Sequence, residues 1–262
     1  MILFLDIGDT LIDEADFAAF RHEQLFEFFM RRGATLGFQE FMALQAQLAA
    51  IGRIPLIDQL KWLAQRLGGD TLLAMEVYRD FVRQVLPQAP ARFKPFHDAD
   101  AVLRELAALH VHGEQARLGI IANQPLWIRN RLDDWNLLSY FEPQAVVISD
   151  EVGVAKPDEN IFLFALAQAD VPADEAFMIG NDYAFDIIPA SQLGMHTIWI
   201  DREDPYAPDA PPVEDSRMAD AHVHHLADVP AAVRRIIEDV DRAKRNGNHH
   251  AGRRARPLKR TR

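Results

Sequence analysis

The feature that most constrains the fold of this chain is a series of short apolar runs separated by helical segments. Five such runs, each bounded by turn or polar residues, are Ile2–Leu5, Leu118–Ala122, Ala145–Ile148, Ala176–Ile179 and His196–Ile200. Apolar runs of this length are typical of strands that are buried on both faces of a parallel sheet. Their alternation with helical patterns predicts an α/β fold built on a doubly wound parallel sheet.

Helical periodicity accompanies the later runs. Helices are expected at Asp98–Leu109, Leu126–Trp135, Glu159–Ala169, Ala184–Leu193 and Pro230–Val240, and Val223 marks a further edge strand. Residues 14–96 differ, because they carry helical periodicity throughout, in four stretches broken by glycines and prolines. Four helices of this length can pack into a small bundle. We therefore predict an α/β core from residues 1–13 and 97–241, with an all-helical cap from residues 14–96 beside the ligand-binding edge of the sheet.

The C-terminal residues 242–262 are basic, with nine Lys or Arg and no Asp or Glu, in a chain whose net charge is −11. This tail has no aromatic side chains for stacking on bases and almost nothing to bury. A disordered, solvated end is therefore favoured over a nucleic-acid-binding arm.

Cysteine is absent, which excludes disulfides and thiolate metal sites. No apolar stretch approaches the ~20 residues that cross a bilayer, and the N-terminus lacks the basic leader of a signal peptide. We therefore expect a cytoplasmic protein.

Polar or charged residues follow four of the predicted strands. Asp6 ends the first run, Asn123 follows the second, Lys156 lies past the third, and Asp182 and Asp186 follow the fourth. The carboxyl ends of parallel strands meet at one edge of a sheet, so these side chains should lie close together. A carboxylate at the end of a buried strand is costly to desolvate and needs a cation as a partner. Together they indicate a site for an anionic or metal-bound ligand.

In order and spacing, these residues resemble the motifs of the haloacid dehalogenase-like (HAD) superfamily of hydrolases. The resemblance covers the chain from Ile2 to about Val240, and the four motifs correspond to Asp6–Thr10, Ala122–Asn123, Lys156–Asp158 and Gly180–Asp186. The helical segment looks like the four-helix cap that this superfamily inserts after its first motif. The resemblance implies a phosphohydrolase that acts on a small phosphorylated metabolite through an aspartyl-phosphate intermediate.

The resemblance also implies a role for each motif residue. Asp6 would be the nucleophile, and Lys156 would neutralise its charge and that of the phosphoryl oxygens. The phosphate-binding residues would be Thr10, Asn123 and Lys156. The implied cofactor is Mg²⁺, held by the carboxylates of Asp6, Asp182 and Asp186 and the backbone carbonyl of Gly8.

Two residues depart from the superfamily's pattern. Gly8 stands where most members have a second Asp, a general acid and base whose contribution is typically ~10²–10⁴-fold. Ala122 stands where the second motif usually offers Ser or Thr to a phosphate oxygen. In the fourth motif Asn181 precedes Asp182, so the sequence leaves open which of the two faces the metal.

The missing acid could be replaced from two places. Asp9 lies one residue beyond the expected position, but this shift changes the direction of the side chain, so a turn- or helix-capping role is favoured. His22 is the nearest histidine of the cap, and we expect it at the surface. Substrates with good leaving groups, such as acyl phosphates, would need no acid.

Three functions are consistent with this pattern. The leading one is a Mg²⁺-dependent phosphohydrolase with reduced or leaving-group-selective activity. A metal-independent 2-haloacid dehalogenase is the second, because such enzymes also lack the second Asp, although the fourth motif fits them poorly. A binding or regulatory protein that has lost catalysis is the third. Retention of Asp6, Lys156, Asp182 and Asp186 argues against that third function.

A histidine pair near the C-terminus could be interpreted as a metal site. Strand alternation places His222 and His224 on one face, but no adjacent carboxylate or third-ligand spacing supports a metal site. Exposed edge positions are the favoured interpretation.

Overall fold

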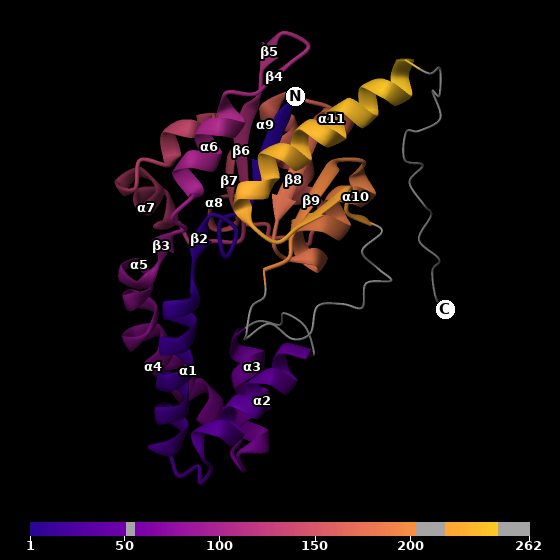
Figure 1. Ribbon diagram of the computed structural model, residues 1–262. Coiled ribbons are helices and arrows are strands. Elements are labelled where there is room, and N and C mark those ends of the chain that lie inside the picture. The colour runs from indigo at the N-terminus through magenta and orange to yellow at the C-terminus, as the bar shows by residue number, and fades with distance from the viewer. Residues whose placement is uncertain (51–55, 203–217, 246–262) are drawn as a thin grey trace, which may run out of the picture. The chain divides into compact units, whose positions relative to one another are not determined.

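The computed structural model describes residues 1–50, 56–202 and 218–245 (Figure 1). By its internal contacts the chain forms two units. The described part of the first consists of Met1–Asp13, Pro95–Arg202 and residues 218–245, and that of the second of Glu14–Lys94.

A six-stranded parallel sheet forms the centre of the first unit. Its strands are β1 (Ile2–Leu5), β6 (Arg117–Ala122), β7 (Val146–Ile148), β8 (Ala176–Gly180), β9 (His196–Ile200) and β10 (Ala221–Val223). Their order across the sheet is β10-β9-β8-β1-β6-β7. The first strand therefore lies inside the sheet, where Ile2 pairs with Arg117 on one side and Ala176 on the other. All five predicted strands and the edge strand at Val223 are confirmed.

Helices cover both faces of this sheet (Figure 1). The helices α9 (Glu159–Ala169) and α10 (Ile188–Leu193) pack against Ile2 and Phe4 of β1. On the other face, α6 (Ala99–Ala107) and α11 (Val229–Arg245) contact each other, and they also contact β6 and β9, respectively. The chain moves from β1 towards β7 and then back towards β10, and right-handed crossovers in opposite directions place their helices on opposite faces. The doubly wound fold is thus confirmed.

Shorter elements complete this unit. One is the predicted helix α7 (Ile128–Asp134). The sequence pattern did not predict the others, which are α8 (Ser149–Val152) and a hairpin of β4 (His110–Val111) and β5 (Glu114–Gln115). Helix α7 begins two residues later than predicted, because the N–H of Ile128 donates to the carbonyl of Pro125 (3.0 Å) and closes a turn ahead of it.

The helix predicted at Ala184–Leu193 is divided. A π-helical turn occupies Tyr183–Ile187, and α10 begins only at Ile188. Pro189 has no N–H to donate to the carbonyl of Phe185, so the regular helical hydrogen bonding cannot cross this point.

The last helix is longer than predicted. Helix α11 continues to Arg245, so the prediction that the tail leaves the fold at Arg242 is wrong by four residues. Arg242, Lys244 and Arg245 lie in its last turn, where cations interact favourably with the helix dipole. The remainder of the predicted tail, residues 246–262, lies outside the described residues.

The second unit is all-helical. Its helices are α1 (Ala15–Met30), α2 (Phe38–Ala50), α3 (Leu56–Arg66), α4 (Thr71–Gln84) and α5 (Ala89–Arg92), and β2 (Ile12–Asp13) and β3 (Lys94–Pro95) mark the two ends of the insert. The unit encloses its own hydrophobic core, in which Phe28, Phe29 and Phe41 are buried. None of the described helices is long and apolar enough to cross a membrane.

Candidate active site

The carboxyl edge of the sheet brings Asp6, Lys156 and Asp186 into direct contact. Asp6 continues the pairing of β1 with β8, since its N–H donates to the carbonyl of Ile179 (2.9 Å). Lys156 Nζ lies 2.6 Å from Asp6 Oδ1 and 2.5 Å from Asp186 Oδ1. The side chains of Asp6, Lys156 and Asp186 are only 10%, 3% and 1% exposed. One buried ammonium group therefore bridges two carboxylates from different strand ends.

Burial and mutual attraction determine the charge of this cluster. Burial alone would lower the pKa of Lys156, but the carboxylates of Asp186 and Asp6 outweigh it and hold that pKa above its usual value. Burial raises the pKa of Asp186 to about 7, although Lys156 acts in the other direction. Asp186 is therefore only partly ionised at neutral pH, but the one ammonium group still leaves the cluster with no net positive charge. Binding a phosphate beside Asp6 therefore requires a further cation.

Asn123 fixes the position of the lysine. Its Nδ2 donates to the carbonyl of Lys156, and its Oδ1 accepts from the N–H of Lys156, both at 2.8 Å. The same segment contains a cis peptide bond between Lys156 and Pro157. These contacts make Asn123 a positioning residue for Lys156. Its predicted contact with a phosphate stays a prediction.

Thr10 links Asp6 to the fourth motif. Its hydroxyl oxygen lies 3.4 Å from Asp6 Oδ2 and 3.2 Å from Asn181 Oδ1, and the residue is fully buried. Asp182 has a different role, because its Oδ1 accepts from the N–H groups of Ala184 (3.1 Å) and Phe185 (3.0 Å). Of the two residues that the sequence left open, Asn181 is thus the one linked to Asp6.

Asp186 lies against the end of β8. Its Oδ2 accepts from the N–H of Asp182 (3.0 Å), so both of its oxygens have protein partners. Gly180 permits this approach: a Cβ there would lie 2.5 Å from Cγ and 2.8 Å from Cβ of Asp186. Asp186 therefore orients Lys156, and the absence of a side chain at Gly180 makes room for the carboxylate of Asp186.

The predicted metal ligands do not converge as three carboxylates. Among the described residues, a group of three His, Asp or Glu ligand atoms within 4.8 Å of one another occurs only at Asp201, His222 and His224. Asp6, Asp182 and Asp186 therefore do not form such a group. The oxygens that face the Thr10 hydroxyl are the carboxylate of Asp6 and the amide oxygen of Asn181. An all-oxygen set of this kind fits Mg²⁺ in donor type.

The turn after β1 contains Gly8 and Asp9. Asp9 has a φ of +51°, a conformation that asparagine, aspartate and glycine adopt more readily than other residues. Arg202, which sequence reasoning missed, donates to the carbonyls of Asp9 (2.9 Å) and Thr10 (3.1 Å) and stacks over Phe96. The backbone of Asp9 is thus part of a held turn, and the expected capping role of its side chain stays a prediction. Arg202 lies two residues after the end of β9, and this position is the signal that could have identified it.

Two further sequence predictions concern the missing donors. Ala122 is fully buried at the end of β6, where it offers no side-chain donor. The expectation that His22 lies at the surface is wrong: only 7% of it is exposed, because it faces the interior of the helical unit. Burial, with the adjacent Arg21 charge, lowers the pKa of His22 to about 4. A histidine that is neutral at pH 7 is a poor general acid.

Comparison with known proteins identifies the family. The model of the haloacid dehalogenase-like hydrolases matches residues 2–200. The chain belongs to this family. A relative over much of its length is the glyceraldehyde 3-phosphate phosphatase of Pyrococcus abyssi, 29% identical over 76% of this chain and 80% of the relative. The phosphoserine phosphatase of Thermus thermophilus is 30% identical over 63% of this chain and 61% of the relative.

Solved structures share the fold. A HAD phosphatase from Thermococcus onnurineus superposes with a TM-score of 0.62 at 22% identity, over 88% of this chain and 97% of that protein. As a member of the haloacid dehalogenase-like family, the chain is a hydrolase, and its curated relatives named above are phosphatases.

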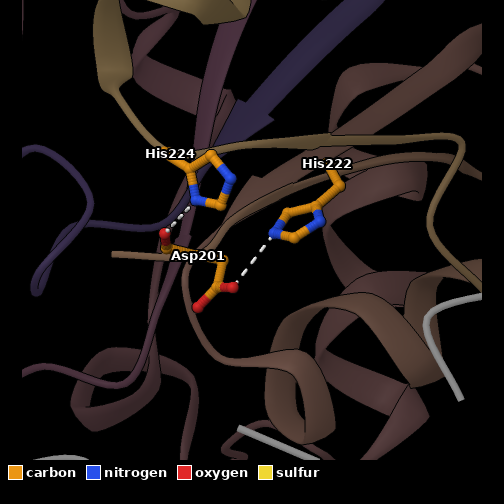
Figure 2. Close-up of side chains that lie close together, drawn as sticks. All are labelled: Asp201, His222 and His224. Atoms are coloured by element: carbon orange, nitrogen blue, oxygen red, sulfur yellow. Dashed lines mark hydrogen bonds and ion pairs between the residues drawn. The ribbon is translucent and has the colours of Figure 1, made fainter. Parts of the chain in front are cut away.

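A second polar cluster lies at the carboxyl edge of the six-stranded sheet, at the ends of β9 and β10. His222 Nε2 is 3.1 Å from Asp201 Oδ2, and His224 Nδ1 is 3.1 Å from the carbonyl oxygen of Asp201 (Figure 2). Both histidines are exposed at the edge of the sheet, as predicted, but a carboxylate accompanies them. Asp201 is distant in sequence, but the pairing of Ile200 with Val223 places it beside His224.

Proposed function

We propose that this chain is a Mg²⁺-dependent phosphohydrolase that acts on small phosphorylated metabolites, with Asp6 as the nucleophile. The observation that carries the proposal is the buried bridge from Lys156 to Asp6 and Asp186. The named activities of the relatives, on glyceraldehyde 3-phosphate and on phosphoserine, support a small phosphate ester or anhydride as the substrate class.

In this proposal the carboxylate of Asp6 attacks phosphorus, forming a P–O bond as the bond to the leaving group breaks with its electron pair. Lys156 holds Asp6 in one orientation and places a positive charge beside the transferring group. Water then attacks the phosphorus of the aspartyl-phosphate and releases phosphate and the free carboxylate. Asp186 contacts neither water nor phosphate in this scheme. It positions Lys156.

The oxygens of Asp6 and Asn181, with the backbone carbonyl of Gly8, would hold Mg²⁺. When bound, Mg²⁺ would supply the positive charge that offsets the repulsion between Asp6 and the phosphate. Asp182, whose Oδ1 caps the following turn, would support the loop that carries Asn181. We further propose that the helical unit Glu14–Lys94 selects the substrate.

Gly8 makes the reaction dependent on the leaving group. Without an acid at this position, a leaving alkoxide departs unprotonated, whereas the carboxylate leaving group of an acyl phosphate needs no proton. Water attack on the aspartyl-phosphate also lacks an assisting base. We therefore expect slow turnover, a preference for acyl phosphates and aryl esters, and an intermediate that accumulates.

The test is phosphate release from acetyl phosphate, p-nitrophenyl phosphate and alkyl phosphate esters, with and without Mg²⁺. The proposal predicts Mg²⁺-dependent release that falls in the order given and is lost in Asp6→Asn. Full activity of Asp6→Asn, or no release from any ester, would overturn it. In the second case, tight binding of phosphate and Mg²⁺ without turnover would indicate a binding protein on the same scaffold.

A further inference from the structure

The cluster of Asp201, His222 and His224 is defined by two neighbouring strands. In the parallel pairing of β9 with β10, Trp199 lies opposite His222 and Ile200 opposite Val223. Asp201 directly follows β9, and His224 directly follows β10. The ligand atoms of the three side chains all lie within 4.8 Å of one another, and Figure 2 shows the side chains gathered around one point.

The spacing of these atoms suits a transition metal. In a tetrahedral site with zinc–nitrogen and zinc–oxygen distances near 2.1 Å, neighbouring ligand atoms are about 3.4 Å apart. The observed distance from His222 Nε2 to Asp201 Oδ2 is 3.1 Å. A small rotation of the side chains would therefore admit a cation between two atoms that now share a hydrogen bond.

The ring of His224 is oriented as in known metal sites. Its Nδ1 lies 3.1 Å from the carbonyl oxygen of Asp201, which can only accept, so this nitrogen carries the proton. The Nε2 lone pair of His224 is then available for a metal. A metal-binding histidine commonly donates its other ring N–H to a backbone carbonyl, which fixes both the tautomer and the ring orientation.

The ring of His222 is also held in place. It stacks on the indole of Trp199, with centroids 4.5 Å apart and planes inclined by 15°. Trp199 itself is buried, and its Nε1 donates to the carbonyl of Asn181 (3.0 Å). The side chains of His222 and Asp201 remain 38% and 28% exposed. A cation can thus reach the cluster and keep water as a further ligand.

We infer that Asp201, His222 and His224 form a second metal site, for a borderline transition-metal cation such as Zn²⁺. Two imidazoles and one carboxylate favour such a cation over Mg²⁺, which prefers oxygen ligands. The site would cross-link the ends of β9 and the three-residue edge strand β10, and it would stabilise their pairing.

A simpler interpretation is an exposed His–Asp ion pair, and the chain provides a matched example of one. His112 Nε2 lies 3.0 Å from Asp241 Oδ1, at a comparable distance from its carboxylate. Within the described residues, no second histidine joins that pair. His112→Gln is therefore the control variant for His222→Gln.

The experiment measures Zn²⁺ binding by calorimetry to the full chain in excess Mg²⁺. All variants are compared in a chain that also carries Asp6→Asn, His249→Ala and His250→Ala. These changes are needed because Asp6 and the adjacent His249 and His250 could also bind zinc. We expect one equivalent of Zn²⁺ and a melting temperature that rises on binding. His222→Gln, His224→Gln and Asp201→Asn should each weaken binding about tenfold or more, and His112→Gln should not.

Trp199 provides a readout at the site itself. Paramagnetic Cu²⁺ or Ni²⁺ bound at His222 should quench the fluorescence of the stacked indole, and Trp199→Phe should remove most of the quenching. The inference is overturned if Zn²⁺ binds no tighter than millimolar, or if the three site variants retain full affinity. Equal loss in His112→Gln would also overturn it.

Discussion

The position of Asp186 depends on the absence of a side chain at Gly180, and Gly180→Ala tests this directly. The added Cβ would lie 2.5 Å from Cγ and 2.8 Å from Cβ of Asp186, whereas ordinary contacts begin at 3.4 Å. The nearest atom is Oδ2 of Asp186, at 2.2 Å, so Asp186 must retreat by about 1.2 Å from a place where Lys156 Nζ and the Asp182 N–H now hold it. Neither of these two hydrogen bonds survives a shift of that size.

The magnitudes follow from those two lost contacts. Hydrogen bonds to charged groups contribute roughly 1.5–3 kcal/mol each, and partial relaxation should leave a loss of about 2–4 kcal/mol in the free energy of unfolding. A catalytic group misplaced by about 1 Å loses about 10²-fold in rate. We expect kcat with acetyl phosphate to fall by about that factor when Lys156 is no longer held, with little change in KM. Urea unfolding and steady-state kinetics measure the two quantities.

Two variants show whether the loss passes through Asp186. In an Asp186→Gly background the new methyl group meets neither the carboxylate nor the Cβ of residue 186, so Gly180→Ala should have little further effect on stability. Gly37→Ala is the matched control, because a Cβ at Gly37 would meet only Glu40 Oε2 at 3.7 Å. Unchanged kcat and stability in Gly180→Ala, or an equal loss in both backgrounds, would refute the reasoning.

Three other substitutions probe separate parts of the account. Gly8→Asp should raise the rate of Asp6 phosphorylation by alkyl phosphates, measured in single turnovers, by ~10²–10⁴-fold, because it restores the acid. The gain with acetyl phosphate should be much smaller. Gly8 is not among the glycines with positive φ, so its backbone conformation suits an L side chain. Burial lowers the pKa of His22 from 6.5 to about 4, so the unfolded chain takes up the proton first as the pH falls, and folding stability declines between these values. His22→Gln should remove about 2 kcal/mol of the decline between pH 7.5 and pH 5, measured by urea unfolding at both. Arg202→Lys should lose the paired contacts to Asp9 and Thr10, lowering the unfolding free energy by about 1–2 kcal/mol and kcat by about tenfold.

Each of these has an outcome that contradicts it. An equal gain in the phosphorylation rate with acetyl phosphate and with alkyl esters in Gly8→Asp would mean that position 8 does not protonate the leaving group. His110→Gln, at an exposed histidine, should leave the pH difference unchanged, and a similar change in both variants would remove His22 as the cause. Wild-type stability of Arg202→Lys would show that the turn after β1 does not depend on the guanidinium.

Much of the α/β unit follows from local pattern. The five apolar runs predict the strands because these strands are largely buried on both faces, where a polar side chain needs a partner. Thr197 in β9 is fully buried, and its hydroxyl donates to the carbonyl of Met218. The strand ends then predict which side chains meet at the edge, as Asp6, Lys156 and Asp186 do. This reasoning needs only periodicity and the parallel direction of the strands.

What the sequence could not supply depends on packing between distant segments. Asn181, and not Asp182, is linked to Asp6 through Thr10. The π-helical turn accounts for this, because in it the Asp182 carboxylate accepts from the N–H groups of Ala184 and Phe185. Asp201 meets His222 only because β9 and β10 pair, and twenty residues separate the two in sequence. The burial of His22 likewise depends on how the helices of its unit pack together. No periodicity or spacing in the sequence predicts these three contacts.

The most direct test of the central claim is to trap the intermediate on Asp6. The protein is mixed with ³²P-acetyl phosphate and Mg²⁺ for less than one turnover, quenched in acid, reduced with borohydride and digested for mass spectrometry. Because no base at position 8 assists hydrolysis, we predict a protein that carries ³²P after the acid quench. Borohydride reduction should release this ³²P-phosphate as it converts residue 6 from aspartate to the corresponding alcohol, homoserine. Phosphate release without label on the protein, or label at any other residue, would contradict it.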